Sequence, residues 1–132
     1  MIPRILIADD CPDIRRIVAA ILDSCGYLVV VAANGLAAWE EVGRDRPSLV
    51  VLDIEMPLLD GCEVCRRIKS QPETRDSPVL VVSASAQAAE LARSAGADAF
   101  LDKPFHVKDL IGQVNLLLHQ RTAVANPAVA NQ

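Results

Sequence analysis

The chain has 132 residues, of which 52% are hydrophobic and 23% are charged, and its formal net charge at pH 7 is −4. This length suits one domain with a substantial core, so we expect no separate output module. The negative balance argues against direct binding of nucleic acid or an anionic membrane. Apolar runs stay well below the roughly 18 residues that a membrane-spanning helix needs, and the N-terminus lacks a secretory signal, so we expect a cytoplasmic protein.

The first segments alternate between a buried strand and an amphipathic helix. Residues 4–8 are an apolar run that predicts a strand, and it ends directly on Asp9-Asp10. Pro12 is suited to the first position of a helix, which Gly26 would end. The helix has an apolar stripe made of Ile14, Ile17, Val18, Ile21 and Leu22. Residues 27–33 predict a second strand, and a helix containing Ala38, Trp39 and Val42 should follow the Asn34-Gly35 turn.

The segment from Ser48 to Gly61 carries the most informative charge. Its apolar run predicts a strand that is buried on both faces, yet the run ends on Asp53. Burial of an isolated carboxylate is costly, so Asp53 should lie at the open end of its strand and face a cation. In the next turn, Asp60 should cap a helix and Gly61 should permit tight backbone geometry. That helix would bury Val64, Cys65 and Ile68 and expose Arg66, Arg67 and Lys69.

The last third repeats the alternation. Residues 79–82 predict a strand that ends on Ser83, and residues 84–94 a helix anchored mainly by Leu91. A short strand at 99–101 would then place Lys103-Pro104 beside the other strand ends. The final helix has an apolar stripe made of Val107, Leu110, Ile111, Val114, Leu117 and Leu118. We expect one domain over residues 1–120 and a flexible C-terminal tail over residues 121–132.

The Cys62-x-x-Cys65 pair has two interpretations. It could form half of a redox or zinc site, but no second pair follows, and His106 and His119 lie far away in the sequence. The pattern therefore favours two small apolar side chains on an amphipathic helix.

Five strands alternating with helices predict a parallel sheet covered by helices on both faces. Ligands of such sheets bind outside the carboxyl ends of the strands. The acids at positions 9, 10 and 53 should meet there, with Ser83 and Lys103 beside them. Three carboxylates in one pocket need a hard divalent cation, for which Mg²⁺ is the best match, and Lys103 would suit a phosphoryl oxygen.

These residues resemble the receiver domain of two-component response regulators, in particular single-domain, chemotaxis-regulator-like members. The resemblance rests on Asp9-Asp10, the run from Asp53 to Gly61, Ser83-Ala84, Gly96-Ala97-Asp98 and Lys103-Pro104-Phe105, in that order over about residues 3–119. It implies a flavodoxin-like (βα)5 fold, which is a doubly wound parallel five-stranded sheet with strand order 2-1-3-4-5. The chain would then be a phosphoacceptor in signalling and not an enzyme with turnover.

The resemblance also implies a role for each residue. Asp53 would take a phosphoryl group from phosphohistidine. Asp10 and Asp53 would bind Mg²⁺ directly, Asp9 through water, and Glu55 through its backbone carbonyl. Lys103 would pair with the acyl phosphate.

Ser83 and Phe100 would be the switch residues that change position on phosphorylation. Expected partners are a sensor histidine kinase or a histidine phosphotransfer protein, and a target protein that docks near the fourth helix, last strand and last helix.

Three departures from the family pattern stand out: Cys11 follows the acidic pair, Ser83 replaces the commoner threonine, and the segment from Ser83 to Lys103 is slightly short. Glu55 adds an acid that we expect to tune the lifetime of the phosphoryl group. Length alone predicts a stand-alone regulator or a shuttle in a phosphorelay. The alternatives are a Mg²⁺-dependent phosphatase with an aspartate nucleophile, which Glu55 partly matches, and a receiver-like binding module that is never phosphorylated.

Overall fold

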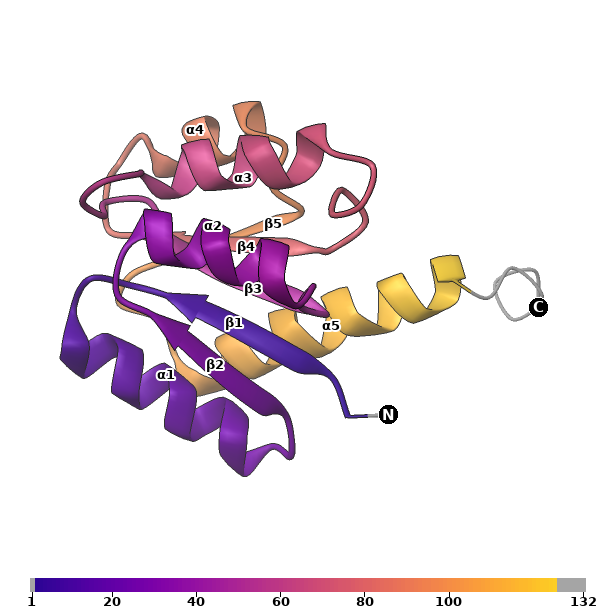
Figure 1. The fold of residues 1–132 in the computed structure, drawn as a ribbon. Coiled ribbons are helices and arrows are strands. Elements are labelled where there is room, and N and C mark those ends of the chain that lie inside the picture. Colours follow the sequence, from indigo (N-terminus) through magenta and orange to yellow (C-terminus); the bar gives the residue numbers. More distant parts are fainter. Residues whose placement is uncertain (1, 126–132) are drawn as a thin grey trace.

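The protein, described here from a computed structural model over residues 2–125, alternates strand and helix five times (Figure 1). The elements in chain order are β1 (Arg4–Ala8), α1 (Pro12–Ser24), β2 (Leu28–Ala32), α2 (Gly35–Arg44), β3 (Leu49–Asp53), α3 (Gly61–Ser70), β4 (Val79–Ser83), α4 (Ala88–Ser94), β5 (Ala99–Asp102) and α5 (Val107–Ala125).

All neighbouring strands pair in parallel, and the strand order is β2-β1-β3-β4-β5. This confirms the predicted flavodoxin-like sheet. β3 and β4 lie inside the sheet, and every residue of both strands is buried. Strands covered on both faces read as continuous apolar runs, which is why their sequences lack an alternating pattern.

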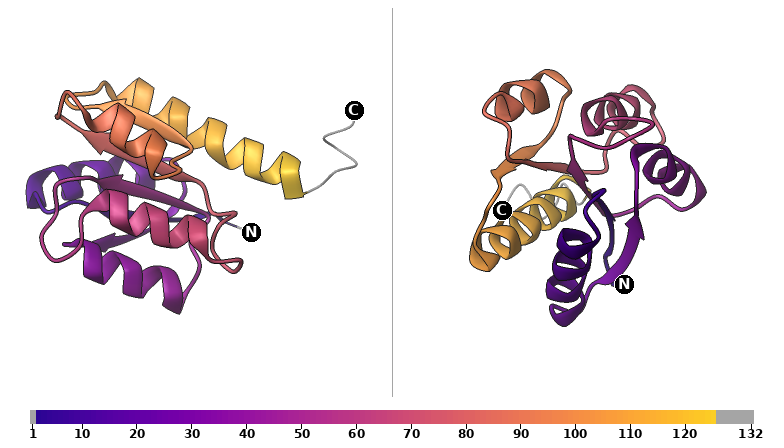
Figure 2. Two further views of the ribbon diagram at one scale, coloured as in Figure 1. Left: turned by 90° about the horizontal axis from the view of Figure 1, so that it is seen from above. Right: turned by 90° about the vertical axis from the view of Figure 1, so that its left-hand side faces the viewer.

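Helices cover both faces of the sheet (Figures 1 and 2), and a hydrophobic core lies between the helices and the sheet on each face. Alternate strand residues, such as Leu6 and Val50, face α2, α3 and α4. Their neighbours, such as Ile7 and Val51, face α1 and α5. Because side chains alternate along a strand, one set of five strands fills both cores.

The helix ends follow the turn chemistry of the sequence. The side chains of Asn34 and Asp60 each accept a hydrogen bond from a backbone N–H of the first turn, at Ala37 and Glu63 respectively, so both residues are N-caps. Gly26 follows α1 with a φ of 91°, a left-handed conformation that glycine adopts without strain. The predicted cap at Asp60 and the predicted end of the first helix at Gly26 are both confirmed.

The prediction for α4 was wrong in its start and in its anchor. The helix begins at Ala88 instead of Ala84, and Leu91 is 48% exposed. Ala88 and Ala92, one turn apart, are the residues buried against the sheet. α4 can lie close to β4 and β5 because the residues that face the sheet, Ala88 and Ala92, are small. Leu91 lies on another side of the helix and is exposed to solvent.

Other side chains at the predicted apolar stripes are also more exposed than expected. Ile17 of α1 and Val107 at the start of α5 are 57% and 50% exposed. Lys69 differs in the opposite direction, because its side chain is only 19% exposed and pairs with Asp98 at 2.7 Å. It therefore joins α3 to the turn before β5 instead of lying on a purely solvated face.

The helix α5 continues to Ala125, beyond the start of the predicted tail at Arg121. Residues 126–132 of that prediction lie outside the described residues. Within the described part of the chain, no helix combines the length and apolar character needed to span a membrane.

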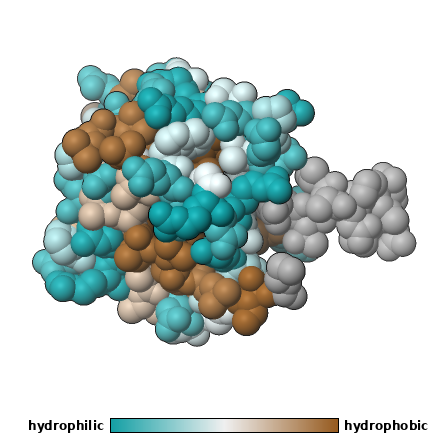
Figure 3. Space-filling view, viewed as in Figure 1, coloured by the Kyte–Doolittle hydropathy of each residue, from teal (hydrophilic) through white to brown (hydrophobic). Residues whose placement is uncertain are grey.

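The surface view in Figure 3 shows two apolar areas on this side of the molecule. One runs along β1 and the edge strand β2. Leu28 and Val31 of β2 and Ile2, just before β1, are about half exposed. The other lies over the loop after β3, where Leu58 is 74% exposed at a φ of 72°. None of these four exposed side chains belongs to either hydrophobic core.

The Cys62 and Cys65 thiols are buried and free. Both belong to the core between the sheet and α2–α4, and the Cys65 thiol donates to the carbonyl of Ala95 at 3.5 Å. Burial raises the pKa of the Cys65 thiol to about 11, so it stays protonated at neutral pH. Both cysteines therefore occupy the surroundings expected for small apolar side chains on an amphipathic helix.

Candidate functional site

The three acids that were predicted to lie together, Asp9, Asp10 and Asp53, form one cluster in the structure. Asp9 and Asp10 follow β1, Asp53 ends β3, and one oxygen from each of the three carboxylates lies within 4.8 Å of the others. Asp9 and Asp53 are buried, whereas Asp10 is exposed. β1 and β3 are neighbours in the sheet, so their carboxyl ends bring these segments together although 43 positions separate Asp10 and Asp53 in the sequence.

Lys103 supplies the positive charge that the buried acids require. Its Nζ donates to Asp9 Oδ2 at 2.8 Å and lies 3.6 Å from Asp53 Oδ1. Its backbone N–H donates to the carbonyl of Ser83 at 2.9 Å, which holds the segment after β5 against the end of β4. The ammonium is thus held between two carboxylates from β1 and β3.

The charges at this edge shift the pKa of both Asp53 and Lys103. Burial raises the pKa of Asp53 from 3.8 to about 6, Lys103 opposes the rise, and Asp9 adds to it. Burial alone would lower the pKa of Lys103, but its hydrogen bond to Asp9 and the negative charge of Asp53 outweigh that effect and raise it. The site therefore disfavours the charged form of Asp53 and favours the charged form of Lys103.

The backbone around Asp53 is tightly packed. A Cβ at Gly61 would lie 2.2 Å from the carbonyl oxygen of Asp53, so no larger residue fits without movement of the main chain. Gly61 also donates its N–H to the carbonyl of Ile54 at 2.9 Å. These contacts fold the loop after β3 back over its own strand and fix where Asp53 emerges.

Ser83 is fully buried at the end of β4. Its Oγ accepts the N–H of Ser85 at 3.1 Å and donates to Glu55 Oε1 at 3.4 Å. Phe100, on neighbouring β5, is partly buried and packs against the core under α4. The two predicted switch residues therefore lie on adjacent strands, and Ser83 lies at the strand end that faces the acids.

Sequence reasoning missed Arg15. Its Nη1 donates to the backbone carbonyl of Asp9 at 2.8 Å, while Asp9 Oδ1 accepts the N–H of Cys11 at 3.0 Å. Together these bonds fix the turn that presents Asp9 and Asp10. An arginine on the polar side of a helix gives no sequence signal for such a contact, because most such residues are solvated.

The donor set fits a hard divalent cation. It consists of carboxylate oxygens, the ligands that Mg²⁺ prefers, and the exposed position of Asp10 leaves room for water ligands. One ammonium balances only part of the charge of three carboxylates, so a divalent cation would remove the remaining repulsion. Among the residues that the structure describes, these three acids form the one such cluster.

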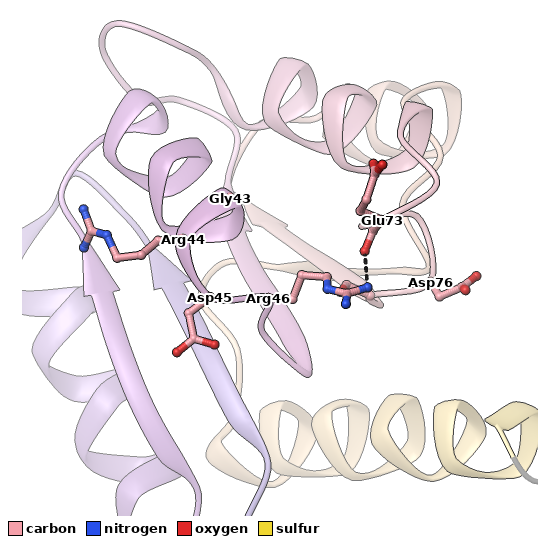
Figure 4. A pocket seen from close by; sticks show the side chains of 7 residues that line it. Gly43, Arg44, Asp45, Arg46, Glu73 and Asp76 are labelled. Atoms are coloured by element: carbon pink, nitrogen blue, oxygen red, sulfur yellow. Dashed lines mark hydrogen bonds between the residues drawn. The ribbon is translucent and has the colours of Figure 1, made fainter.

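A second, polar pocket lies at the opposite edge of the sheet, near the start of β3 and β4 (Figure 4). It is lined by Gly43, Arg44, Asp45, Arg46, Glu73, Asp76 and Ser77. Arg46 donates to the backbone carbonyl of Glu73 at 2.6 Å, and Asp45 pairs with Arg4. Arg44 also pairs with Glu41, so the two arginines and Asp45 of this pocket already have partners, and they do not converge on one group as the acids do at Asp53.

Comparisons with known proteins agree with the geometry. The family model of the response regulator receiver domain matches residues 5–115. "Response regulator MprA" of Mycobacterium leprae is 41% identical over 119 residues, which is 89% of this chain and 51% of that protein. The chain thus spans about half the length of the curated relatives it matches.

Solved structures show the same fold. Chemotaxis protein CheY4 of Vibrio cholerae is 26% identical with a TM-score of 0.82, covering 89% of this chain and 99% of that one. The receiver domain of a sensor histidine kinase from Pseudomonas aeruginosa is 28% identical with a TM-score of 0.84, covering 90% and 99%. That structure has a magnesium ion coordinated in its active-site cleft.

Proposed function

This chain belongs to the response regulator receiver domains of two-component systems, and from that premise we propose that Asp53 accepts a phosphoryl group from a phosphohistidine donor. The observation that carries the proposal is the convergence of Asp9, Asp10 and Asp53 within 4.8 Å, with Lys103 Nζ at 2.8 Å from Asp9 and 3.6 Å from Asp53. The donor would belong to a sensor histidine kinase or a histidine phosphotransfer protein.

In the proposed reaction an Asp53 oxygen attacks phosphorus, the bond from phosphorus to the histidine nitrogen breaks, and the departing imidazole takes a proton from solvent. Asp10 and Asp53 would hold Mg²⁺ directly, with Asp9 behind a water and the Glu55 carbonyl as a further ligand. When bound, the ion spreads the charge of the transferring group.

After transfer, Lys103 would pair with a phosphoryl oxygen, and Ser83 would donate its hydroxyl to another. The phosphoryl group carries about −1.5 to −2 charges in place of the single charge of the Asp53 carboxylate. Ser83 and Phe100 would then change position and shift the surface formed by α4, β5 and α5, where a target protein docks. Signalling would follow from this contact and not from substrate turnover or from binding of nucleic acid. Action as a stand-alone protein and a cytoplasmic location stay predictions.

Acetyl phosphate with Mg²⁺ tests the acceptor, with intact mass as the readout. We expect one phosphoryl adduct on the protein, none on Asp53→Asn, and an unaltered adduct on Asp60→Asn, where asparagine keeps the helix cap. An unchanged mass of the native chain would instead support a binding module that is never phosphorylated. Continuous hydrolysis of a phosphomonoester would support the phosphatase alternative.

Lys103→Ala tests the coupling step. The variant should keep the fold and still accept a phosphoryl group, but phosphorylation should no longer change binding to the target, because the group loses its ammonium partner. Equal binding of the phosphorylated variant and the phosphorylated native protein would contradict this role.

A further inference from the structure

The Ser83 hydroxyl already has a partner that any phosphoryl group would have to replace. Its single proton is donated to Glu55 Oε1, and the Ser85 N–H donates to one of its lone pairs. Ser83 is fully buried, whereas Glu55 is exposed and follows Asp53 by two positions. The side chain of Glu55 thus reaches from the surface to a buried hydroxyl at the end of β4, the strand that pairs with the strand of Asp53.

We propose that Glu55 is a positioning residue that holds the Ser83 hydroxyl away from the acceptor in the resting protein. We call the bond from Ser83 Oγ to Glu55 Oε1 the Glu55 latch. The inference rests on the proposed function, because the latch matters only if a phosphoryl oxygen competes for the same proton. It assigns the Glu55 side chain a role separate from that of its backbone carbonyl.

The geometry makes the latch easy to release. At 3.4 Å it is long for an O–H···O bond, for which about 2.7–2.8 Å is usual, so a phosphoryl oxygen at ordinary distance offers Ser83 a better acceptor. The exposed Glu55 side chain can turn into water without leaving a buried charge.

Glu55 opposes the phosphoryl group in two separable ways. Its carboxylate competes for the Ser83 proton, and its negative charge repels the negatively charged phosphoryl group. Glu55→Gln keeps an acceptor oxygen for Ser83 but removes the charge. Glu55→Ala removes both, so comparison of the two variants isolates the latch.

The experiment measures the affinity for beryllofluoride, a phosphoryl analogue, at saturating Mg²⁺, so that changes in metal affinity do not enter. Both variants should bind the analogue more tightly than the native protein. Glu55→Ala should bind about two- to threefold more tightly than Glu55→Gln, which is the low end expected for a lost hydrogen bond. In a Ser83→Ala background, the two variants should bind equally.

Glu73 provides the matched control, because it is exposed on the connection between α3 and β4 at the opposite edge of the sheet. Glu73→Gln and Glu73→Ala should bind the analogue as the native protein does. Higher salt should weaken the advantage of Glu55→Gln, which is electrostatic, and leave the ratio between the two Glu55 variants unchanged.

The latch is overturned if Glu55→Ala and Glu55→Gln bind equally with Ser83 present, or if their difference persists in the Ser83→Ala background. Either result leaves the proposed function standing, provided that the native protein binds the analogue. A native protein that binds no beryllofluoride and takes no phosphoryl group would remove the proposed function, and the latch with it.

Discussion

At the scale of single residues, Gly61 sets the position of Asp53. A methyl group there would meet the Asp53 carbonyl at 2.2 Å and the Ile54 Cα at 3.0 Å, both of them backbone atoms that cannot turn aside. Gly61→Ala should therefore destabilise the fold by about 1–3 kcal/mol and slow phosphorylation, as measured by urea unfolding and intact mass. Gly112→Ala in α5, where a Cβ meets nothing within 4 Å, should be neutral or slightly stabilising.

Lys103 controls the charge of Asp53 at the same scale. Burial raises the pKa of Asp53 to about 6, and Lys103 works against that rise. Lys103→Ala should therefore raise the pKa of Asp53 further in metal-free protein, as followed by carboxyl carbon NMR. Exposed Lys108→Ala is the control, and a pKa that stays near 6 in Lys103→Ala would show that the ammonium does not act on Asp53.

At the scale of elements, α4 is held by its small residues. Leu91 is 48% exposed, so Leu91→Ala should change the free energy of unfolding by no more than about 0.5 kcal/mol. Ala92 is 1% exposed, and Ala92→Leu should cost about 1–3 kcal/mol because it pushes the helix away from the sheet. Urea unfolding of both variants checks this order, and a larger loss for Leu91→Ala would contradict it.

The same helix shows where sequence reasoning reaches its limit. The central strands were predictable because buried apolar runs that end on a polar residue admit few other structures, and their ends led to Asp9, Asp53, Ser83 and Lys103. β2, at the edge of the sheet, is partly exposed and ends on Ala32, so it contributed no such residue. In α4 the largest apolar residue, Leu91, was expected to anchor the helix. The helix instead lies close to the sheet, where only side chains as small as alanine fit between them. The contact from Arg15 to the Asp9 carbonyl depends on where a long side chain bends, and no spacing rule encodes that.

At the scale of the whole molecule, the acidic edge lowers stability. The folded chain protonates Asp53 with a pKa of about 6, against an ordinary value of 3.8, so between these values the folded state binds more protons than the unfolded state. Stability contributed by this group is thus present at low pH and falls as the pH rises through about 6.

Asp53→Asn should therefore be more stable than the metal-free native protein at pH 7, by about 2–3 kcal/mol, and the difference should shrink below pH 5. Thermal unfolding at several pH values measures both. Added Mg²⁺ should raise the Tm of the native protein more than that of the variant. A pH-independent difference between the two proteins would show that Asp53 is not the titrating group.

The positions of the charged site residues along the chain affect how fragments of the protein should be designed. The three carboxylates are contributed by the first half of the chain, while their ammonium, Lys103, arrives only after β5. A truncated version that stops at β4 would retain the whole negative cluster without its counter-charge. Shortened forms made for binding studies should therefore extend past Lys103, and a two-piece reconstitution split between β4 and β5 would report its reassembly through recovery of acceptor chemistry.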